Sequence, residues 1–154
     1  MKKIQWKTLI LYLAIPLATG ALSGFLTRNA MEKYLQLKQP PLSPPSAVFP
    51  VVWTVLFLLM GISSYLVAVK NTQKPAVPYI YWIQLAFNFF WTLIFFNRGL
   101  YLLAFFWLLA LIALVAWMIL RFRTIDRTAA LLQVPYLLWL IFAGYLNLSI
   151  VLLN

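Results

Sequence analysis

The third apolar segment of this chain carries polar side chains at a regular spacing. Gln84, Asn88 and Thr92 recur every four residues, so a helix places them on one face, with Trp91 beside it. Amides and hydroxyls are costly in an apolar segment unless they are hydrogen-bonded, and each is therefore a candidate for function. The chemistry open to these residue types is hydrogen bonding, either to a ligand or to other helices.

Two further apolar segments carry aromatic faces. The face in the fifth segment begins with a tryptophan and ends with an asparagine, and the face in the second segment has fewer residues and no amide. Their positions are Trp139, Phe142, Ala143, Leu146 and Asn147 in the fifth segment, and Trp53, Phe57 and Met60 in the second. Such faces predict either a cavity for a flat apolar ligand, in which rings supply contact area and amides fix orientation, or plain packing with amide bonds between helices. Spacing alone does not choose between these interpretations.

Other kinds of chemistry are excluded by composition. The chain has no cysteine and no histidine, so we expect no metal site, disulfide or thiol catalysis, and no bound cofactor. Its two carboxylates, Glu32 and Asp126, lie in connectors, and no charged residue lies in the middle of an apolar segment. An ion-coupled transporter usually needs a buried carboxylate. Neither such a transporter nor acid–base catalysis is therefore expected.

Composition predicts an all-α integral membrane protein. Of 154 residues, 65% are hydrophobic and 9% charged, against about 25% charged in soluble domains, and the mean hydropathy is +0.93. The net charge of +10 comes from residues in the connectors between apolar segments, where it orients helices against anionic lipid. The expected partner of this charge is the lipid bilayer, and no nucleic acid is expected.

We expect one domain, residues 1–154, with five transmembrane helices. The first segment resembles a signal peptide but is long enough to span, so we expect it to be retained, and Gly20 and Gly24 to let a neighbouring helix approach closely. The expected spans are 8–26, 48–69, 79–96, 100–120 and 129–153.

The connector at 28–46 is the longest polar stretch. Residues 29–37 fit a short surface helix, and prolines then stiffen an extended stretch, namely Pro40, Pro41, Pro44 and Pro45. We expect this proline-rich first loop to cover the mouth of the helical bundle.

Five spans place the two termini on opposite sides of the membrane. Eight Lys and Arg residues fall on the N-terminal side and four on the other. By the positive-inside rule this asymmetry predicts a cytoplasmic N-terminus, in what we expect to be a bacterial cell membrane.

The chain contains three ordered motifs. They are Tyr34-x-x-Leu37-x-Gln39-Pro40 with Pro44-Pro45-x-x-Val48-Phe49-Pro50-x-x-Trp53-Thr54, then Gln84-Leu85-Ala86-Phe87-Asn88-Phe89-Phe90-Trp91, then Pro135-Tyr136-Leu137-x-Trp139 with Phe142-Ala143 and Leu146-Asn147. With these motifs the chain resembles a known family, the tryptophan-rich sensory proteins of the TspO/MBR group, related to the mitochondrial translocator protein or peripheral benzodiazepine receptor. The resemblance extends from about Tyr34 to Asn154.

The resemblance implies a five-helix bundle, often a homodimer, with a pocket beneath the first loop that binds porphyrins, benzodiazepine-type drugs and, in some members, sterols. Some bacterial members are reported to degrade protoporphyrin in light, which makes Trp53 and Trp139 catalytic candidates. With Asn147 added from the spacing, the expected ligand-binding residues are Tyr34, Trp53, Asn88, Trp91, Trp139, Phe142, Ala143, Leu146 and Asn147.

The sequence also departs from the family pattern. Residues frequent in the family are replaced by Gln39, Leu42, Ala47 and Leu93, and no basic residue follows Arg127, so we expect no sterol site of the kind that needs one. The first hypothesis is a sensor-like receptor for protoporphyrin IX, whose propionates would meet Arg28, Lys33 and Lys38. The alternatives are light-dependent porphyrin degradation and transport of a porphyrin or other lipophile.

Overall fold

The computed structural model describes residues 3–74 and 76–154. Two residues of the sequence analysis therefore lie outside the described residues: Lys2, which was included in the charge count, and Pro75, in the connector between the second and third spans. The described part is helical, and five of its helical segments are long and apolar enough to cross a membrane, which confirms the predicted fold class. The elements are α1 (Trp6–Thr27), the 3₁₀ turn η1 (Arg28–Ala30), α2 (Met31–Leu35), α3 (Val48–Lys70), α4 (Tyr79–Thr92), the π turn η2 (Leu93–Asn97), α5 (Tyr101–Arg123), α6 (Arg127–Leu132) and α7 (Val134–Leu153).

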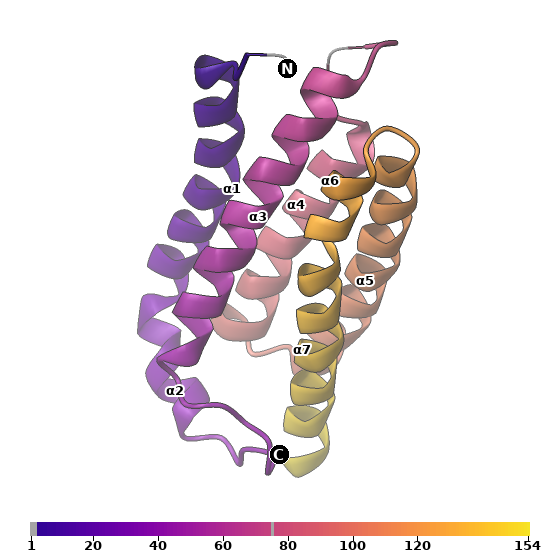
Figure 1. Ribbon diagram of the computed structural model, residues 1–154. Coiled ribbons are helices and arrows are strands. Elements are labelled where there is room, and N and C mark those ends of the chain that lie inside the picture. The colour runs from indigo at the N-terminus through magenta and orange to yellow at the C-terminus, as the bar shows by residue number, and fades with distance from the viewer. Residues whose placement is uncertain (1–2, 75) are drawn as a thin grey trace.

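The long helices stand side by side in a bundle, and the two ends of the chain lie at opposite ends of it (Figure 1). α1 packs chiefly on α3, α4 on α5, and α5 on α7. Large apolar side chains such as Trp6, Phe25, Phe106 and Trp117 remain about 60% exposed on the outer surface. Such a surface is consistent with contact to lipid, so the chain is an integral membrane protein.

The fourth helix is longer than expected. α5 continues through Arg121 to Arg123, residues that the sequence analysis placed in a connector. Cationic side chains are favourable near the C-terminus of a helix, and they do not interrupt it. The connector is therefore short, and Asp126 begins the next helix as its N-cap, accepting a 2.6 Å hydrogen bond from the backbone N–H of Ala129.

The fifth span is broken at Gln133 into α6 and α7. Pro135 lacks a backbone N–H and crowds the carbonyl one turn earlier, so a continuous helix is disfavoured there. The Gln133 N–H bonds to the carbonyl of Ala130 rather than to that of Ala129. The Ala129 carbonyl instead accepts a 2.7 Å hydrogen bond from the Ser63 hydroxyl of α3, which ties the break to the bundle.

Close contact between α1 and α3 depends on a glycine that the sequence analysis did not single out. A Cβ on Gly61 of α3 would lie 2.8 Å from the Leu13 Cα and 2.9 Å from the Tyr12 carbonyl oxygen, so the two backbones meet here. Of the two expected glycines, Gly20 faces the Phe57 ring, whereas a Cβ on Gly24 would have no neighbour within 4 Å. The expectation of close helix approach is therefore wrong for Gly24.

We predict that Gly61→Ala lowers the free energy of unfolding by about 1–3 kcal/mol, because the added methyl group would meet backbone atoms that cannot move aside. Gly144→Ala is the matched control, since Gly144 is also buried within a helix but its Cβ would make only ordinary contacts, the nearest at 3.9 Å. Thermal unfolding in detergent measures both. Equal stability of the two variants would contradict the close approach at Gly61.

At the N-terminal end of the bundle, Asp126 is nearly buried and forms an ion pair with the half-exposed Lys70. Burial by itself would raise the pKa of the Asp126 carboxyl. Hydrogen bonds from Lys70 and the Ala129 N–H, together with the charge of Lys70, outweigh it and lower the pKa below its ordinary value. A carboxyl whose pKa is lowered in the folded state stabilises that state at neutral pH, and this contribution disappears as pH falls through the folded-state pKa.

We predict that Asp126→Ala destabilises the protein by about 1–2 kcal/mol at pH 7, through loss of the helix cap. The difference from the wild type should shrink as the pH falls through the folded-state pKa of Asp126, which lies below the ordinary value, because the wild-type carboxyl then becomes protonated in the folded state as well. Asp126→Asn, which keeps a capping oxygen, should lose less. Unfolding curves from pH 7 to pH 3 test this, and a pH-independent difference would contradict it.

Candidate ligand-binding pocket

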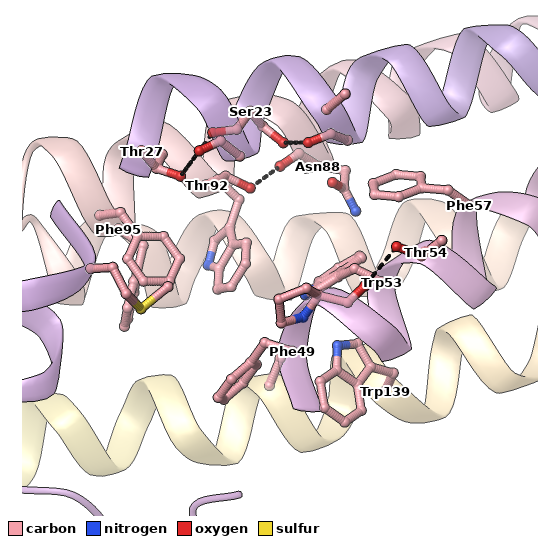
Figure 2. A pocket seen from close by; sticks show the side chains of 18 of the residues that line it. Ser23, Thr27, Phe49, Trp53, Thr54, Phe57, Asn88, Thr92, Phe95 and Trp139 are labelled. Atoms are coloured by element: carbon pink, nitrogen blue, oxygen red, sulfur yellow. Dashed lines mark hydrogen bonds between the residues drawn. The ribbon is translucent and has the colours of Figure 1, made fainter. Parts of the chain in front are cut away.

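A cavity of about 430 Å³ lies between α1, α3, α4 and α7. Met31 and Tyr34 border it from the short helix α2, and Phe49 and Pro50 from the first turn of α3. Figure 2 shows aromatic rings from several helices and the Asn88 amide projecting into one space. The polar and aromatic faces singled out in the sequence therefore do meet around a cavity.

Eight of the nine expected ligand-binding residues line this cavity, namely Tyr34, Trp53, Asn88, Trp91, Trp139, Ala143, Leu146 and Asn147. Phe142 is not among the lining residues, and it borders a shallow outer groove between α3 and α7 instead. The reason is helical rotation: at 100° per residue, Phe142 lies about 60° to one side of Trp139, whereas Ala143 lies about 40° to the other. Phe142 therefore does not line the cavity, and its expected part in ligand binding stays a prediction.

Trp53 lies at the centre of the aromatic wall. Its ring centroid is 6.5 Å from that of Trp91 on α4, 6.5 Å from Trp139 on α7 and 6.3 Å from Tyr136. Trp53 and Trp139 are nearly perpendicular, at 89°. Both candidates for photochemistry thus stand in the cavity wall, and the rings offer flat surfaces in more than one orientation.

Asn88 lines the cavity, and its side chain is fixed by a hydrogen bond to a residue outside the cavity lining. It is 2% exposed, and its Nδ2 donates a 2.8 Å hydrogen bond to the Tyr136 hydroxyl. That hydroxyl donates in turn to Gln84 Oε1, also at 2.8 Å. Within the described part of the chain, no hydrogen bond is donated to the side-chain oxygen of Asn88, Oδ1, so this atom is available to an N–H or O–H group of a ligand; the backbone carbonyl of Asn88 is occupied by Thr92.

Asn147 is engaged differently. Its Oδ1 accepts a 3.2 Å hydrogen bond from the Trp91 indole, and its Nδ2 donates a 2.8 Å bond to the Tyr101 carbonyl. The side chain therefore joins α7 to α4 and α5. Of the two interpretations open at the sequence level, helix packing describes Asn147 well, and Asn88 is the amide placed to orient a ligand.

Sequence reasoning missed the whole contribution of α1. Six of its residues line the cavity, and all but the first are small or carry a hydroxyl: Leu17, Gly20, Ala21, Ser23, Gly24 and Thr27. The signal was present, because Gly20, Gly24 and Thr27 fall at i, i+4 and i+7 on one helical face. The sequence analysis interpreted that face only as a packing surface. Its small side chains also leave unfilled the volume that forms the cavity.

The hydroxyl groups of the wall face the cavity as acceptors. Thr27 donates to the Ser23 carbonyl at 2.8 Å, Ser23 to the Gly20 carbonyl at 3.0 Å, and Thr92 to the Asn88 carbonyl at 3.2 Å, as the dashed lines of Figure 2 show. Each proton is used within its own helix. The oxygens keep free lone pairs, so the α1 and α4 side of the cavity favours ligand groups that donate hydrogen bonds.

Tyr34 closes the aromatic wall at the mouth of the cavity. It is 7% exposed, and its ring centroid lies 5.7 Å from Phe95 and 5.4 Å from Phe96. The loop that follows is held at two points: Gln39 Nε2 donates to the Tyr34 carbonyl at 3.0 Å, and the Lys38 backbone N–H donates to Asn154 Oδ1, also at 3.0 Å.

The basic residues expected to meet a ligand do not line the cavity. Arg28, Lys33 and Lys38 are all exposed on the segment that includes η1, α2 and the start of the loop. Arg28 turns back toward its own helix, with its guanidinium 3.8 Å from the centre of the Phe25 ring. These charges therefore lie near the end of the bundle that carries the mouth, outside the cavity itself.

The bundle and its cavity define a class of protein: a helical integral membrane protein with an aromatic cavity between its helices. Comparison with known proteins is more specific. The model of the TspO/MBR family matches residues 12–153, and the chain belongs to this family.

Relatives come from bacteria, fungi and mammals. The chain is 35% identical to the tryptophan-rich protein TspO of Chlorobaculum tepidum, over 97% of this chain and 98% of that protein. It is 35% identical to a translocator protein homolog of Schizosaccharomyces pombe, over 91% and 88%, and 31% identical to the translocator protein of Ovis aries, over 92% and 87%. The likeness therefore covers nearly the whole length of each chain.

Proposed function

We propose that this protein is a membrane receptor that binds a planar, hydrophobic ligand of the porphyrin type, with protoporphyrin IX as its representative, in the cavity between its helices. The observation that carries the proposal is the grouping of Trp53, Trp91 and Trp139, from three different helices, around one cavity of about 430 Å³. Flat rings supply large apolar contact area to a flat ligand. Benzodiazepine-type compounds share this chemistry and are expected to bind at the same place.

The polar groups of the cavity fit such a ligand. Asn88 Oδ1 and the hydroxyl oxygens of Ser23 and Thr92 can accept hydrogen bonds from N–H or O–H groups at the edge of a ligand. A few polar groups in an apolar cavity fix the orientation of a ligand that the aromatic contacts alone would leave free.

The first loop would cover the bound ligand. Figure 1 shows this loop at the same end of the bundle as the C-terminus, where the hydrogen bond from Lys38 to Asn154 links the two. Tyr34 stands at the mouth, and the exposed ammonium groups of Lys33 and Lys38 lie on the adjoining segment. Carboxylates at the edge of a porphyrin that project from the cavity would be attracted to these charges.

We predict that protoporphyrin IX, added in the dark to the protein in detergent, quenches tryptophan fluorescence saturably at micromolar concentration.

Gly24→Leu should weaken this binding at least about tenfold, because the leucine side chain would occupy cavity space. The fold should tolerate the change, since a Cβ at this position has no neighbour within 4 Å. Trp53→Phe, Trp139→Phe and Asn88→Ala should also weaken binding. Trp117→Phe, at a 60% exposed position on α5, is the matched control.

Quenching that does not saturate, and that is equal in the wild type, Gly24→Leu and Trp117→Phe, would contradict the proposal. The porphyrin would then only partition into the detergent micelle. The aromatic wall would have to be attributed to packing.

We further propose that the N-terminus is cytoplasmic in a bacterial cell membrane and that two chains form a homodimer. Among the described residues, Lys3, Lys7, Lys70 and Lys74 and three arginines from Arg121 to Arg127 lie toward the N-terminal end of the bundle, and four basic residues lie toward the other. Sedimentation in detergent tests the dimer, because a particle containing one chain would exclude it.

We predict opposite labelling of two single-cysteine variants, which the cysteine-free chain makes simple to prepare. Leu42→Cys lies in the first loop at a 69% exposed position and should react with a membrane-impermeant maleimide on intact cells. Lys74→Cys, in the connector between α3 and α4, should react only after the membrane is permeabilised. The reverse pattern would contradict the proposed orientation.

A further inference from the structure

A layer of buried polar side chains lies behind the cavity and takes no part in its lining. Tyr81, Gln84 and Gln133 are each 0% exposed. Three of their polar atoms have no hydrogen-bond partner within the described part of the chain, namely Gln84 Nε2 and both Nε2 and Oε1 of Gln133. The Tyr81 hydroxyl oxygen forms no bond of good geometry there, and the Ser64 side chain of α3 lies close to it. Buried polar groups are rarely left unpaired in native proteins, so this concentration needs a physical explanation.

These atoms lie on two helical faces that meet. Tyr81 and Gln84 are three residues apart on α4, and Gln133, the N-cap of α7, comes three residues before Tyr136, so each pair lies on one side of its helix. The hydrogen bond from the Tyr136 hydroxyl to Gln84 Oε1 joins the two faces. α4 and α7 run in the same direction through the bundle (Figure 1), so one turn back along each helix leads from Gln84 to Tyr81 and from Tyr136 to Gln133.

Gln133 lies at the break between α6 and α7. Its backbone N–H bonds to Ala130, and Pro135 two residues later removes a helical donor. The side chain stays fully buried at the break, with both amide atoms unpaired. A glutamine without partners here would cost stability, and apolar residues of similar size would avoid that cost.

We propose that Tyr81, Gln84 and Gln133 form a binding site for an internal water molecule. Gln84 Nε2 and Gln133 Nε2 supply donors, Gln133 Oε1 supplies an acceptor, and the Tyr81 hydroxyl can do either. A water molecule donates two hydrogen bonds and accepts two, and buried waters typically make about three. The site extends the network of hydrogen bonds that joins Asn88 in the cavity wall to Tyr136 and then to Gln84.

The direction in which Gln133→Met shifts the thermal midpoint tests the proposed water site. Methionine has nearly the shape of glutamine but lacks its polar atoms. Gln133→Met should lower the thermal midpoint, by roughly 3 °C or more, because the water loses contacts and Gln84 loses its bridge. Leu140→Met is the matched control, since Leu140 is also 0% exposed on α7 and has no polar atom to lose. A rise in the midpoint for Gln133→Met would show that the amide had no partner and would overturn the proposal.

Radiolytic labelling identifies the partner as water. X-ray pulses generate hydroxyl radicals from water in place, so a buried side chain next to a bound water is oxidised. Tyr81 should be labelled in the folded wild type despite its burial, and labelling should fall severalfold in Gln133→Met. Met60, also 0% exposed, is the buried control, and Tyr79, 84% exposed, is the accessible one. Tyr81 labelling no greater than that of Met60 would overturn the proposal, and neither measurement requires porphyrin.

Discussion

The rest of this structure depends on one constraint: hydrogen-bonding groups inside an apolar bundle must find partners within the protein. In hydrocarbon an unpaired amide or hydroxyl is costly, because no solvent is available to satisfy it. The chain meets the constraint with bonds between helices. Asn147 joins α7 to α4 and α5, and the Tyr136 hydroxyl joins α7 to α4 through both Asn88 and Gln84. These bonds set how α4 and α7 face each other, and the aromatic wall is built on those two helices and α3.

The cavity results from a mismatch of side-chain size between facing helices. α1 presents small residues, among them Gly24, toward the large rings of α3, α4 and α7. At Gly61 the backbones of α1 and α3 meet, so the two helices are held close at that level, whereas near Gly24 no side chain fills the space. A dense core and an open cavity thus coexist along one pair of helices, and the cavity keeps apolar walls with a few oriented polar groups.

Proline shapes this bundle at two places with different consequences. Pro50 falls in the first turn of α3, where a backbone N–H has no helical partner in any case, so the helix begins before it and Pro50 borders the cavity. Pro135 falls where a continuous fifth helix would otherwise run, and it separates α6 from α7. That break releases the Ala129 carbonyl to bond Ser63 of α3, and it holds Gln133 in the interior.

The sequence by itself determined the all-α class and the five apolar spans, because hydrophobicity and the length needed to cross a bilayer are local properties. It also identified Trp53, Asn88 and Trp139 as cavity residues, since helical spacing and the family motifs both point to them. Only the tertiary structure decided how helical faces are rotated and paired. Rotation excluded Phe142 and brought in α1, and pairing committed Asn147 to Trp91 and Tyr101 while leaving the side-chain oxygen of Asn88 open to the cavity. The physical reason is that a spacing pattern states which residues share a face, whereas the partner of that face depends on contacts between residues far apart in the chain.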